Sequence, residues 1–553
     1  MRRGGEIGNS LNNQLLFLHP LMNLTVTRLP YRQTNHFSKI ALDYIDQSEQ
    51  LKPFFTHPPS LQGIQASIEA RKQFPTNRKL IVEELRKQYA EITTSERVKQ
   101  NIETLLSENS FTITTAHQNN IFLGPLFVIY KTLHLIKLAD HLNSSLPQQK
   151  FVPVFYMGSE DADLDELNHI YVEGEKLTWN TKQTGAVGRM KIDKDLLKII
   201  SKIEGQLTVL PNGNEIISLI KDCYKEGDAI QHATFKFLNS LFGEYGLVVL
   251  IADNPALKKQ MTKIFEDDLM NQTASGVVQQ TAGKLEEAGY KTQAHPRDVN
   301  LFYLKDNTRN RIIFENERYT VVDTRIDFSK GEILKELNEY PERFSPNVIL
   351  RGLYQETILP NIAFIGGGGE LAYWLELKEL FQHYKVPYPV LVLRNSFLLV
   401  EKKWQEKINK LGFETEDFFL SEEELMKKFV VRESKRDIRL NGNLDEAVQL
   451  YELIKIQAAK VDITLAGHVE ALKIQTLHRL EELEKKMLRA EKRKFIDQQR
   501  QIHSIKQKLF PQNGLQERID NFTYYYAKWG RKFLQQLYQH SLALEQEFVI
   551  LSE

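Results

Sequence analysis

The sequence predicts an α/β fold with a parallel sheet, followed by a long helical region. Two short runs of β-branched and aromatic residues, 111–115 and 151–157, flank an apolar segment with helical spacing. This order is typical of a strand, a helix and a second strand, and such a unit favours a parallel sheet with a right-handed crossover. After Asn441 the strand-like runs stop, and apolar residues recur with helical spacing. We therefore expect a sheet-containing core and a distinct helical part.

The remaining strands of the core are predicted from the segments up to residue 430, which alternate strand-like and helical runs as in an α/β sandwich. Segment 241–255 predicts a buried strand entering a turn. Segment 361–384 predicts a strand, a glycine turn and a helix. Segment 386–400 predicts another buried strand with a polar exit. Together with the strand–helix–strand unit over 111–157, these segments assign residues 22–430 to the α/β core.

Three segments are expected to lie outside the regular core. Residues 1–21 read as a disordered or mis-assigned leader, because a more regular strand-like segment begins at Met22. A signal peptide is not expected, because His19 and Pro20 interrupt the apolar patch of the leader and no small-residue cleavage site follows. Segments 172–230 and 256–345 are more charged and less regular. We expect them to be insertions that decorate the sheet without cores of their own.

Residues 441–510 predict a helical coiled coil. A helix over 444–460 is followed by a second that could continue to Leu509, before Pro511 stops it. The second helix carries apolar residues that step by three, four and three, which is coiled-coil spacing: Leu480, Leu483, Met487 and Ala490. We expect a helical hairpin with an irregular seam.

The apolar stripe of the second helix predicts a homodimer. The first helix is less than half as long, so it can cover only part of the stripe, and an uncovered apolar stripe requires a partner. A second copy of the chain is the commonest solution. Leu480 and Met487 are therefore expected at or near the subunit contact. The aromatic, amphipathic segment 511–553 is expected to return to the core as helix.

The composition of the chain argues against several classes of function. The 553 residues are 42% hydrophobic and 26% charged, with a formal net charge of zero. This balance is ordinary for a globular protein and gives no general attraction for nucleic acid or an anionic membrane. No apolar run approaches the roughly 20 residues that a membrane-spanning helix needs. The single cysteine, Cys223, excludes an intrachain disulfide and a cysteine-based metal cluster, so we expect a cytoplasmic protein.

Polar residues follow the two strands of the first unit. His117 and three amide residues come directly after the first strand, shortly before a helix that begins after Gly124 and Pro125. A helix N-terminus can bind an anion, and histidine or amide groups there can hydrogen-bond phosphate oxygens. A turn histidine that only caps backbone groups is the alternative. Because ligands bind beyond the carboxyl ends of parallel strands, we expect a site here.

An acidic run follows the second strand. Glu160, Asp161 and Asp163 could hold Mg²⁺ or a substrate ammonium, or act as a general base. A solvated acidic loop is the alternative. Asn168 and His169 come close behind and are expected in the same pocket.

A glycine turn and several arginines complete the candidate site. The run from Gly366 to Gly369 allows close approach of the backbone to a phosphate, although it matches neither the Walker pattern nor G-x-G-x-x-G. Arginine forks near turns, such as Arg189 and Arg351, recognise carboxylates or phosphates. Surface ion pairs are the alternative for each arginine.

These motifs together resemble those of a known family, the bacillithiol biosynthesis cysteine-adding enzymes. The similarity runs in order from about Met22 to the C-terminus, and it rests on TTAHQNNIFLGPLFVIYK, FVPVFYMGSEDADLDELNHI, GAVGRM, LFGEYGLVVL, HPRDVNLFY, YPERFSPNVILR, ILPNIAFIGGGGELAYW, VDITLAGHVEAL, LRAEKRK and LFPQNGLQER. The chain departs from the family pattern in GGGGE, where a proline-containing turn is usual, and in Ala116, where glycine is usual. Both departures leave the polar groups in place.

The resemblance implies a Rossmann-like core related to class I aminoacyl-tRNA synthetases, with two connecting-peptide insertions, and a C-terminal coiled coil used for dimerisation. The implied activity is an ATP-dependent ligase, with Mg²⁺, that adds L-cysteine to glucosaminyl-malate in the last step of bacillithiol synthesis. By the synthetase analogy, His117 and Gln118 occupy the histidine-rich signature after the first strand. Arg394 and Ser396 stand near a second phosphate-contacting loop. The sequence leaves open whether the carboxyl is activated as an adenylate or a phosphate.

These arguments give three groups of predicted site residues, with no metal ligand set within the chain. The predicted catalytic residues are His117, Gln118 and Asp161. The predicted substrate-binding residues are Glu160, Asp163, Asn168, His169, Arg189, Arg351, Glu370, Tyr373 and Trp374. The predicted nucleotide-binding residues are Asn120, Gly124, Gly366, Gly367, Gly368, Arg394 and Ser396.

Two other functions remain open at this stage. One is an amino-acid-activating enzyme of the same fold with a different acceptor, such as tRNA, although zero net charge and the lack of a recognisable anticodon-binding module disfavour tRNA. The other is a coiled-coil scaffold whose α/β domain is not catalytic. Polar clusters at several strand ends disfavour it.

Overall fold

The computed structural model describes residues 24–434 and 440–553, so the predicted leader 1–21 lies outside the described residues. The chain divides into two compact units. The first runs up to Leu398 and includes Glu517–Leu551, and the second consists of Leu399–Gln516 with the last two residues. The division between the units thus precedes residue 430, where the sequence-based core ends. None of the described helices is both long and apolar enough to span a membrane.

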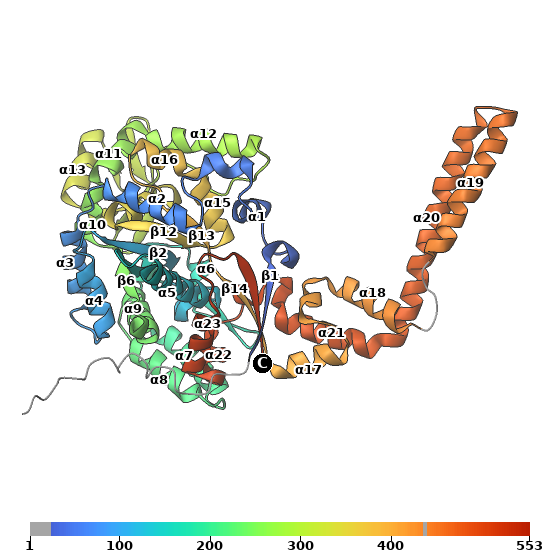
Figure 1. Cartoon of the computed structure of the whole chain (residues 1–553). Helices are drawn as coiled ribbons and strands as arrows, with labels where there is room; N and C mark the ends of the chain where they lie inside the picture. Colours follow the sequence, from blue (N-terminus) through green and yellow to red (C-terminus); the bar gives the residue numbers. More distant parts are fainter. Residues whose placement is uncertain (1–23, 435–439) are drawn as a thin grey trace, which may run out of the picture. The chain divides into compact units, whose positions relative to one another are not determined.

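A parallel five-stranded sheet forms the centre of the first unit (Figure 1). Its strand order is β13-β12-β2-β3-β6, and every neighbouring pair is parallel. The strands are β13 (Val390–Leu393), β12 (Asn361–Gly366), β2 (Ser110–Gln118), β3 (Lys150–Gly158) and β6 (Val248–Ile251). Each is almost wholly buried. Burial on both faces explains their continuous apolar runs.

The first βαβ unit is confirmed. Helix α5 (Phe127–Ser145) connects β2 to β3 and packs against both strands. The two strands are in register along their whole length, from Ser110 opposite Lys150 to Gln118 opposite Gly158. Both polar clusters predicted from the sequence therefore leave the sheet at the same edge.

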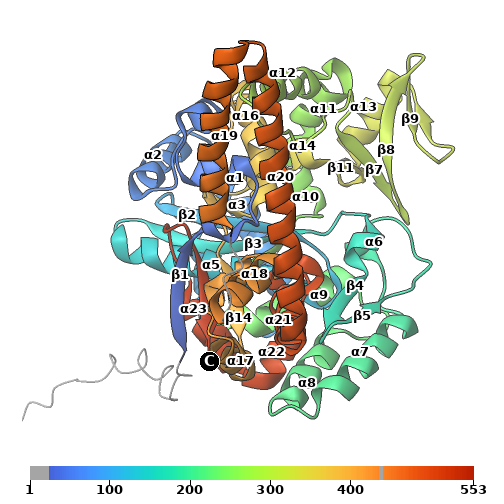
Figure 2. The same ribbon diagram turned by 90° about the vertical axis from the view of Figure 1, so that its right-hand side faces the viewer.

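The remaining helices of the first unit surround this sheet (Figure 2). They are α1 (Lys39–Ile45), α2 (Leu61–Lys72), α3 (Arg78–Tyr89), α4 (Glu96–Thr104), α6 (Leu164–Leu167), α9 (Ile230–Phe242), α14 (Val348–Ile358), α15 (Gly368–Glu376) and α16 (Lys378–His383). Helix α2 packs against β12, and α9 packs against β6.

The prediction of one strand over 386–400 was wrong. The segment forms two strands, β13 and β14 (Ser396–Val400), which belong to different sheets. Between them Arg394 N donates to Gly366 O at 2.8 Å, and Asn395 N donates to His134 Nδ1 at 3.0 Å. These bonds end the parallel pairing and turn the chain toward a three-stranded sheet of order β1-β15-β14, with β1 at Thr25–Pro30 and β15 at Glu547–Ser552.

The two irregular segments have defined structures. Segment 172–230 contributes to the hairpin of β4 (His169–Val172) and β5 (Glu175–Thr178), and then forms α7 (Lys194–Leu207) and α8 (Gly213–Cys223). Segment 256–345 contains an antiparallel sheet of order β10-β9-β8-β7-β11 that the sequence did not predict. Its elements are α10 (Pro255–Lys258), α11 (Thr262–Asn271), α12 (Thr273–Glu287), β7 (Leu301–Lys305), β8 (Thr308–Glu315), β9 (Arg318–Val321), β10 (Asp327–Phe328), α13 (Lys330–Glu339) and β11 (Phe344–Pro346).

The second unit is helical, with α17 (Lys402–Lys410), α18 (Glu422–Glu433), α19 (Asn441–Val461), α20 (Leu465–Lys492) and α21 (Ile496–Leu509). Helices α19 and α20 lie side by side as a hairpin in both views (Figures 1 and 2). The expected single helix to Leu509 was wrong, and so was the expectation that the first helix is less than half as long as the second, because α19 has 21 residues and α20 has 28. A short 3-10 turn at Arg493–Phe495 separates α20 from α21, because Phe495 leaves helical geometry at φ −114° and ψ 35°.

The chain returns to the first unit after the second. Segment Glu517–Leu551 carries α22 (Phe522–Trp529) and α23 (Arg531–His540). Helix α22 packs against α8, and α23 packs against α5. Aromatic residues of α22 are buried in these contacts, including Phe522 and Tyr525.

Candidate active site

A cavity of about 370 Å³ lies at the carboxyl edge of the central sheet. This is the edge at which open parallel sheets bind ligands. Residues that follow β2, β3, β6, β12 and β13 all contribute to its wall. The lining comprises Ala116, His117, Gln118, Phe127, Tyr156, Met157, Gly158, Ser159, Glu160, Asp161, Glu166, Ala252, Arg309, Pro346, Asn347, Val348, Arg351, Gly367, Gly368, Gly369, Glu370, Tyr373, Arg394 and Arg518.

His117 is a half-buried, neutral imidazole at the end of β2. Burial, reinforced by the charge of Lys131, lowers its pKa to about 3. Its ring meets the edge of Phe127 at 5.3 Å between centroids. Nε2 is buried and has no hydrogen-bond partner among the described residues. An unsatisfied polar atom of this kind costs free energy unless a ligand or water satisfies it, so His117 is available to a ligand in the cavity.

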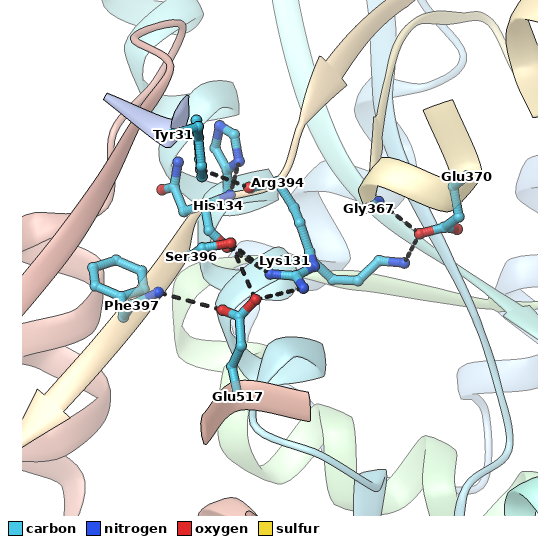
Figure 3. A network of polar contacts seen from close by, with 10 residues as sticks. Tyr31, Lys131, His134, Gly367, Glu370, Arg394, Ser396, Phe397 and Glu517 are labelled. Atoms are coloured by element: carbon cyan, nitrogen blue, oxygen red, sulfur yellow. Dashed lines mark hydrogen bonds and ion pairs between the residues drawn. The ribbon is translucent and has the colours of Figure 1, made fainter. Parts of the chain in front are cut away.

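The glycine turn after β12 is held by an ion pair whose lysine is fully buried (Figure 3). Glu370 Oε2 accepts from Gly367 N at 2.8 Å and from Lys131 Nζ at 2.9 Å. Lys131 lies on α5, is fully buried, and also donates to Ala116 O at 2.6 Å. Burial would raise the pKa of Glu370, but Lys131 and the Gly367 N–H outweigh it and lower that pKa. Glu370 is therefore ionised and fixes the start of α15 beside β2.

A second buried ion pair holds the turn after β13 (Figure 3). Arg394 Nη2 donates to Glu517 Oε1 at 2.7 Å, and the side chains are 3% and 0% exposed. The Glu517 carboxylate also accepts from Ser396 Oγ at 3.1 Å and from Phe397 N at 3.3 Å. The charge of Arg394 is thus already balanced within the protein.

The other three arginines of the cavity are not balanced in this way. Arg309 donates to Ser345 Oγ at 3.1 Å, and Arg351 donates to Tyr373 Oη. Within the described part of the chain, neither these two nor Arg518 forms an ion pair, and Arg351 Nη1 is buried without a hydrogen-bond partner. Guanidinium groups with free donors bind carboxylates or phosphates in bidentate fashion. Arg351 and Arg518 can therefore bind an anionic ligand, whereas the charged neighbours of Arg309 are Glu160 and Asp161.

The acidic side of the cavity follows β3. Gln118 Nε2 donates to Asp161 Oδ2 at 3.0 Å, so the two predicted catalytic residues are in contact. Burial, followed by the charges of Asp161 and Asp163, raises the pKa of Glu166. Carboxylates in this position can bind an ammonium group or accept a proton.

A cluster of buried charges lies behind this acidic side. Lys258 is fully buried, forms an ion pair with Glu160 and lies 3.6 Å from Asp253 Oδ1. Asp253 accepts two hydrogen bonds from Arg189, at 2.6 and 2.7 Å. Burial raises the pKa of Glu160 against the opposing effect of Lys258. Glu160 is the member of this cluster that reaches the cavity.

The cavity brings together ten of the predicted site residues from four strand ends and two helices. They are His117, Gln118, Glu160, Asp161, Arg351, Gly367, Gly368, Glu370, Tyr373 and Arg394. Their roles remain predictions.

Nine predicted site residues do not line the cavity. Asp163 caps α6, accepting from Glu166 N, and Arg189 is engaged by Asp253. Ser396 donates to Glu517, as described above. Trp374 is fully buried and packs against Phe364 at 4.6 Å between ring centroids. The direct substrate contacts predicted for Asp163, Arg189 and Trp374 are therefore not supported by their positions.

The other five lie in turns or at a strand end. Asn168 and His169 hydrogen-bond to each other at 3.2 Å at the start of the β4–β5 hairpin. Gly124 has φ +62°, and a Cβ there would lie 2.7 Å from Asn120 Cβ, so these two form a tight turn. Gly366 ends β12 and accepts from Arg394 N. Of these five, only Gly124 has a positive φ, which explains glycine at that position.

The sequence reasoning missed several residues of the site. Arg309 lies on β8 of the unpredicted antiparallel sheet, and Arg518 lies in the returning segment. Lys131 and Lys258 looked like ordinary helix lysines. The only available signal for Lys131 was its position within a largely apolar helix, which charged residues occupy only when paired.

Two family models cover almost the whole chain. Residues 24–395 match the N-terminal Rossmann-like domain of bacillithiol biosynthesis BshC. Residues 397–553 match its C-terminal coiled-coil domain. The chain belongs to the BshC family. Membership agrees with the parallel sheet of the first unit and with the helical hairpin of the second.

Full-length relatives agree with the BshC assignment. A protein of Flavobacterium johnsoniae is 40% identical over 528 residues, covering 95% of this chain and 99% of its own length. A protein of Cytophaga hutchinsonii is 41% identical over 501 residues, covering 90% and 94%. Both are named "putative cysteine ligase BshC". A putative arginyl-tRNA synthetase of Campylobacter jejuni aligns over 82% of this chain and all of its own, at 9% identity and a TM-score of 0.20, which supports no inference. The relationship to class I synthetases stays a prediction.

Proposed function

We propose that this BshC-family protein is an ATP-dependent cytoplasmic ligase that joins the carboxyl of L-cysteine to the amine of glucosaminyl-malate, the last step of bacillithiol biosynthesis. Its relatives are named as cysteine ligases, which supports the reaction class. The main structural support is that one cavity is lined both by arginines without an ion pair, Arg351 and Arg518, and by the carboxylates of Asp161 and Glu166. A ligation of this kind needs both, because it combines anionic groups with an amine.

The arginines that line the cavity can assist the activation of the carboxyl group. A carboxylate is a poor electrophile, so it must be activated before an amine can attack it. ATP supplies this activation by transferring an adenylyl or phosphoryl group. Charge that develops on the phosphate is stabilised by fixed donors. Available donors in the cavity are the neutral His117 imidazole, the backbone N–H groups of Gly368 and Gly369 in the first turn of α15, and the guanidinium groups of Arg351 and Arg518.

The carboxylates that line the cavity can bind the amine groups of the two substrates. Asp161 and Glu166 can hold a substrate ammonium in place. A carboxylate with a raised pKa, such as Glu166, is also a better proton acceptor than an ordinary surface carboxylate when the acceptor amine attacks. No group of three or more metal-ligating side chains occurs among the described residues. Mg²⁺ would therefore be held mainly by the nucleotide phosphates and water, as is usual for this ion.

The direct test is reconstitution. Full-length protein incubated with L-cysteine, glucosaminyl-malate, ATP and Mg²⁺ should yield bacillithiol, detected by mass spectrometry, and omission of ATP should abolish it. AMP or ADP in the same samples distinguishes adenylate from phosphate activation. Cells lacking the protein should lose bacillithiol and accumulate glucosaminyl-malate. A protein that consumes ATP with cysteine but ignores glucosaminyl-malate would instead support an amino-acid-activating enzyme with another acceptor.

Asp161→Asn is expected to raise the KM for cysteine, or the Mg²⁺ concentration required, about tenfold, because hydrogen bonds to a charged group contribute about 1.5–3 kcal/mol. The Asp161 oxygens accept from Gln118 Nε2 and from Asp163 N, and the asparagine keeps one acceptor oxygen, so the melting temperature should fall only slightly. The matched control is Asp165→Asn, an exposed residue of α6 outside the cavity. If only the melting temperature of Asp161→Asn falls, the loop is structural.

A homodimer through the α19–α20 hairpin is part of the proposal. Its support is exposed apolar surface: Leu465, Leu472 and Leu483 are 40%, 40% and 46% exposed. They are spaced by seven and eleven residues, close to whole helical turns, so they share one face of α20. Leu480 and Met487, expected at the contact, are half-buried. The exposed leucines are therefore the better test positions.

Replacing both Leu472 and Leu483 with glutamate should give monomers in analytical ultracentrifugation. The matched control is Ile474→Glu, since Ile474 is 61% exposed on the same helix but lies about half a turn away from Leu472. Wild-type protein that sediments as a monomer at micromolar concentration contradicts the dimer.

A further inference from the structure

Arg518 lines the cavity from a part of the chain far from every other lining residue. It stands in the short turn Gln516–Arg518, just after the chain leaves the second unit. Sequence motifs around the strand ends gave no indication of it. What it contributes to the site depends on how firmly this returning segment is placed.

Contacts on both sides of Arg518 fix the segment. Glu517 forms the buried ion pair with Arg394 that holds the turn after β13 (Figure 3). Asn521 Nδ2 donates to Phe122 O at 3.1 Å and to Gly124 O at 2.6 Å, in the turn that follows β2. Leu126 N donates to Asp520 O at 2.8 Å. Residues 517–521 thus bridge two turns of the candidate site.

The turn after β2 needs such support. Phe122, Leu123 and Gly124 have successive φ values of 48°, 65° and 62°. Left-handed geometry is costly for residues with a side chain, and it persists where the surroundings enforce it. Because Asn521 satisfies two carbonyls of this turn, the segment that carries Arg518 and the turn near His117 form one structure.

Arg518 supplies positive charge that the protein does not balance. Its immediate charged neighbours are Arg394, Glu517 and Glu370. Glu517 is used by Arg394, and Glu370 is used by Lys131. Arg518 is an exposed residue at the lining of the cavity, so its guanidinium is accessible to an anion that enters there.

Two further observations identify the place of that anion. The N-terminus of α15, with Gly368 and Gly369, lines the same cavity. The buried His117 Nε2, which lacks a partner in the described structure, lies in the wall as well. We propose that Arg518 binds a phosphate group of the nucleotide, seated between its guanidinium and the Gly367–Gly369 turn. This inference rests on the proposed use of ATP.

The test is direct binding of ATP, and of inorganic pyrophosphate as a minimal probe, to full-length protein by isothermal titration calorimetry. Arg518→Gln is expected to weaken both Kd values about 10- to 100-fold, the range for a lost charge-assisted hydrogen bond. It should also reduce the salt dependence of binding. Arg518→Lys should recover part of the loss, because it restores the charge without the fork. Binding of L-cysteine alone and the melting temperature should not change.

The matched control is Arg531→Gln. Arg531 is half-exposed in the same returning segment and lies 3.4 Å from Glu244, outside the cavity. The inference is overturned if Arg518→Gln binds both probes like the wild type, or if the wild type binds neither. A protein that binds ATP through Arg518 but makes no bacillithiol contradicts only the proposed function.

Discussion

His117→Ala is expected to lower kcat about 10²-fold or more, which is the effect of removing one preorganised donor or proton-transfer group. The imidazole is half-buried at the end of β2, and its buried Nε2 has no partner in the described structure. If it contacts a phosphate during transfer, its loss affects the chemical step more than substrate binding. The measurement is steady-state kinetics of bacillithiol formation, with kcat and KM determined separately.

His117→Gln is the informative companion, because an amide nitrogen can take the place of Nε2 and should restore part of the rate. Circular dichroism and melting curves check that each variant folds. Normal bacillithiol levels in cells carrying His117→Ala contradict the assignment.

The pKa of His117 also predicts the response to pH. Since the folded pKa is about 3 and the ordinary value is 6.5, the imidazole stays neutral at all working pH values. The kcat profile should therefore show no inflection from His117 between about pH 5 and 9. Below pH 6.5 the unfolded chain binds a proton that the folded protein excludes. The contribution of the neutral His117 to the free energy of unfolding is thus fully present above pH 6.5 and is lost as the pH falls toward 3.

Site residues that lie at or just beyond the strand ends could be predicted from the sequence. His117, Asp161 and Gly367 come directly after buried parallel strands, and the alternation of strands and helices fixes that position without any tertiary information. Two adjacent residues that were both predicted for the site lie in different surroundings because of helix geometry. Tyr373 and Trp374 are consecutive on α15, so they point about 100° apart, one into the cavity and the other into the core.

Other residues could not be predicted because long-range packing places them. Arg309 reaches the cavity from β8, which pairs with β7 and β9 in a sheet whose charged strands lack clear alternation. Arg518 arrives after an intervening helical unit of more than 100 residues. Lys131 is recognisable only once Glu370, 239 positions later, is known to meet it. Each of these residues depends on a contact between distant segments.

The largest stability effect is expected from a buried ion pair in the same unit. Arg71 on α2 and Glu356 on α14 lie 2.8 Å apart, with side chains 1% and 0% exposed. Arg71 also donates to Glu356 O at 2.7 Å, and Asn361 Nδ2 at the start of β12 donates to Glu356 Oε1 at 2.7 Å. Arg71→Met should lower the free energy of unfolding by about 3–5 kcal/mol, because it leaves a carboxylate buried without its counter-charge. Urea unfolding followed by tryptophan fluorescence measures it.

The double variant Arg71→Met/Glu356→Leu separates charge from packing. It removes both ions, and a buried pair replaced by apolar side chains costs far less than a broken pair. The double variant should therefore be more stable than Arg71→Met alone. Arg32→Met is the surface control: Arg32 is 52% exposed in its ion pairs with Asp43 and Asp46, so its loss should leave the free energy of unfolding almost unchanged. If Arg71→Met costs as little as Arg32→Met, the buried pair does not hold α2 and α14 to the strand that carries the glycine turn.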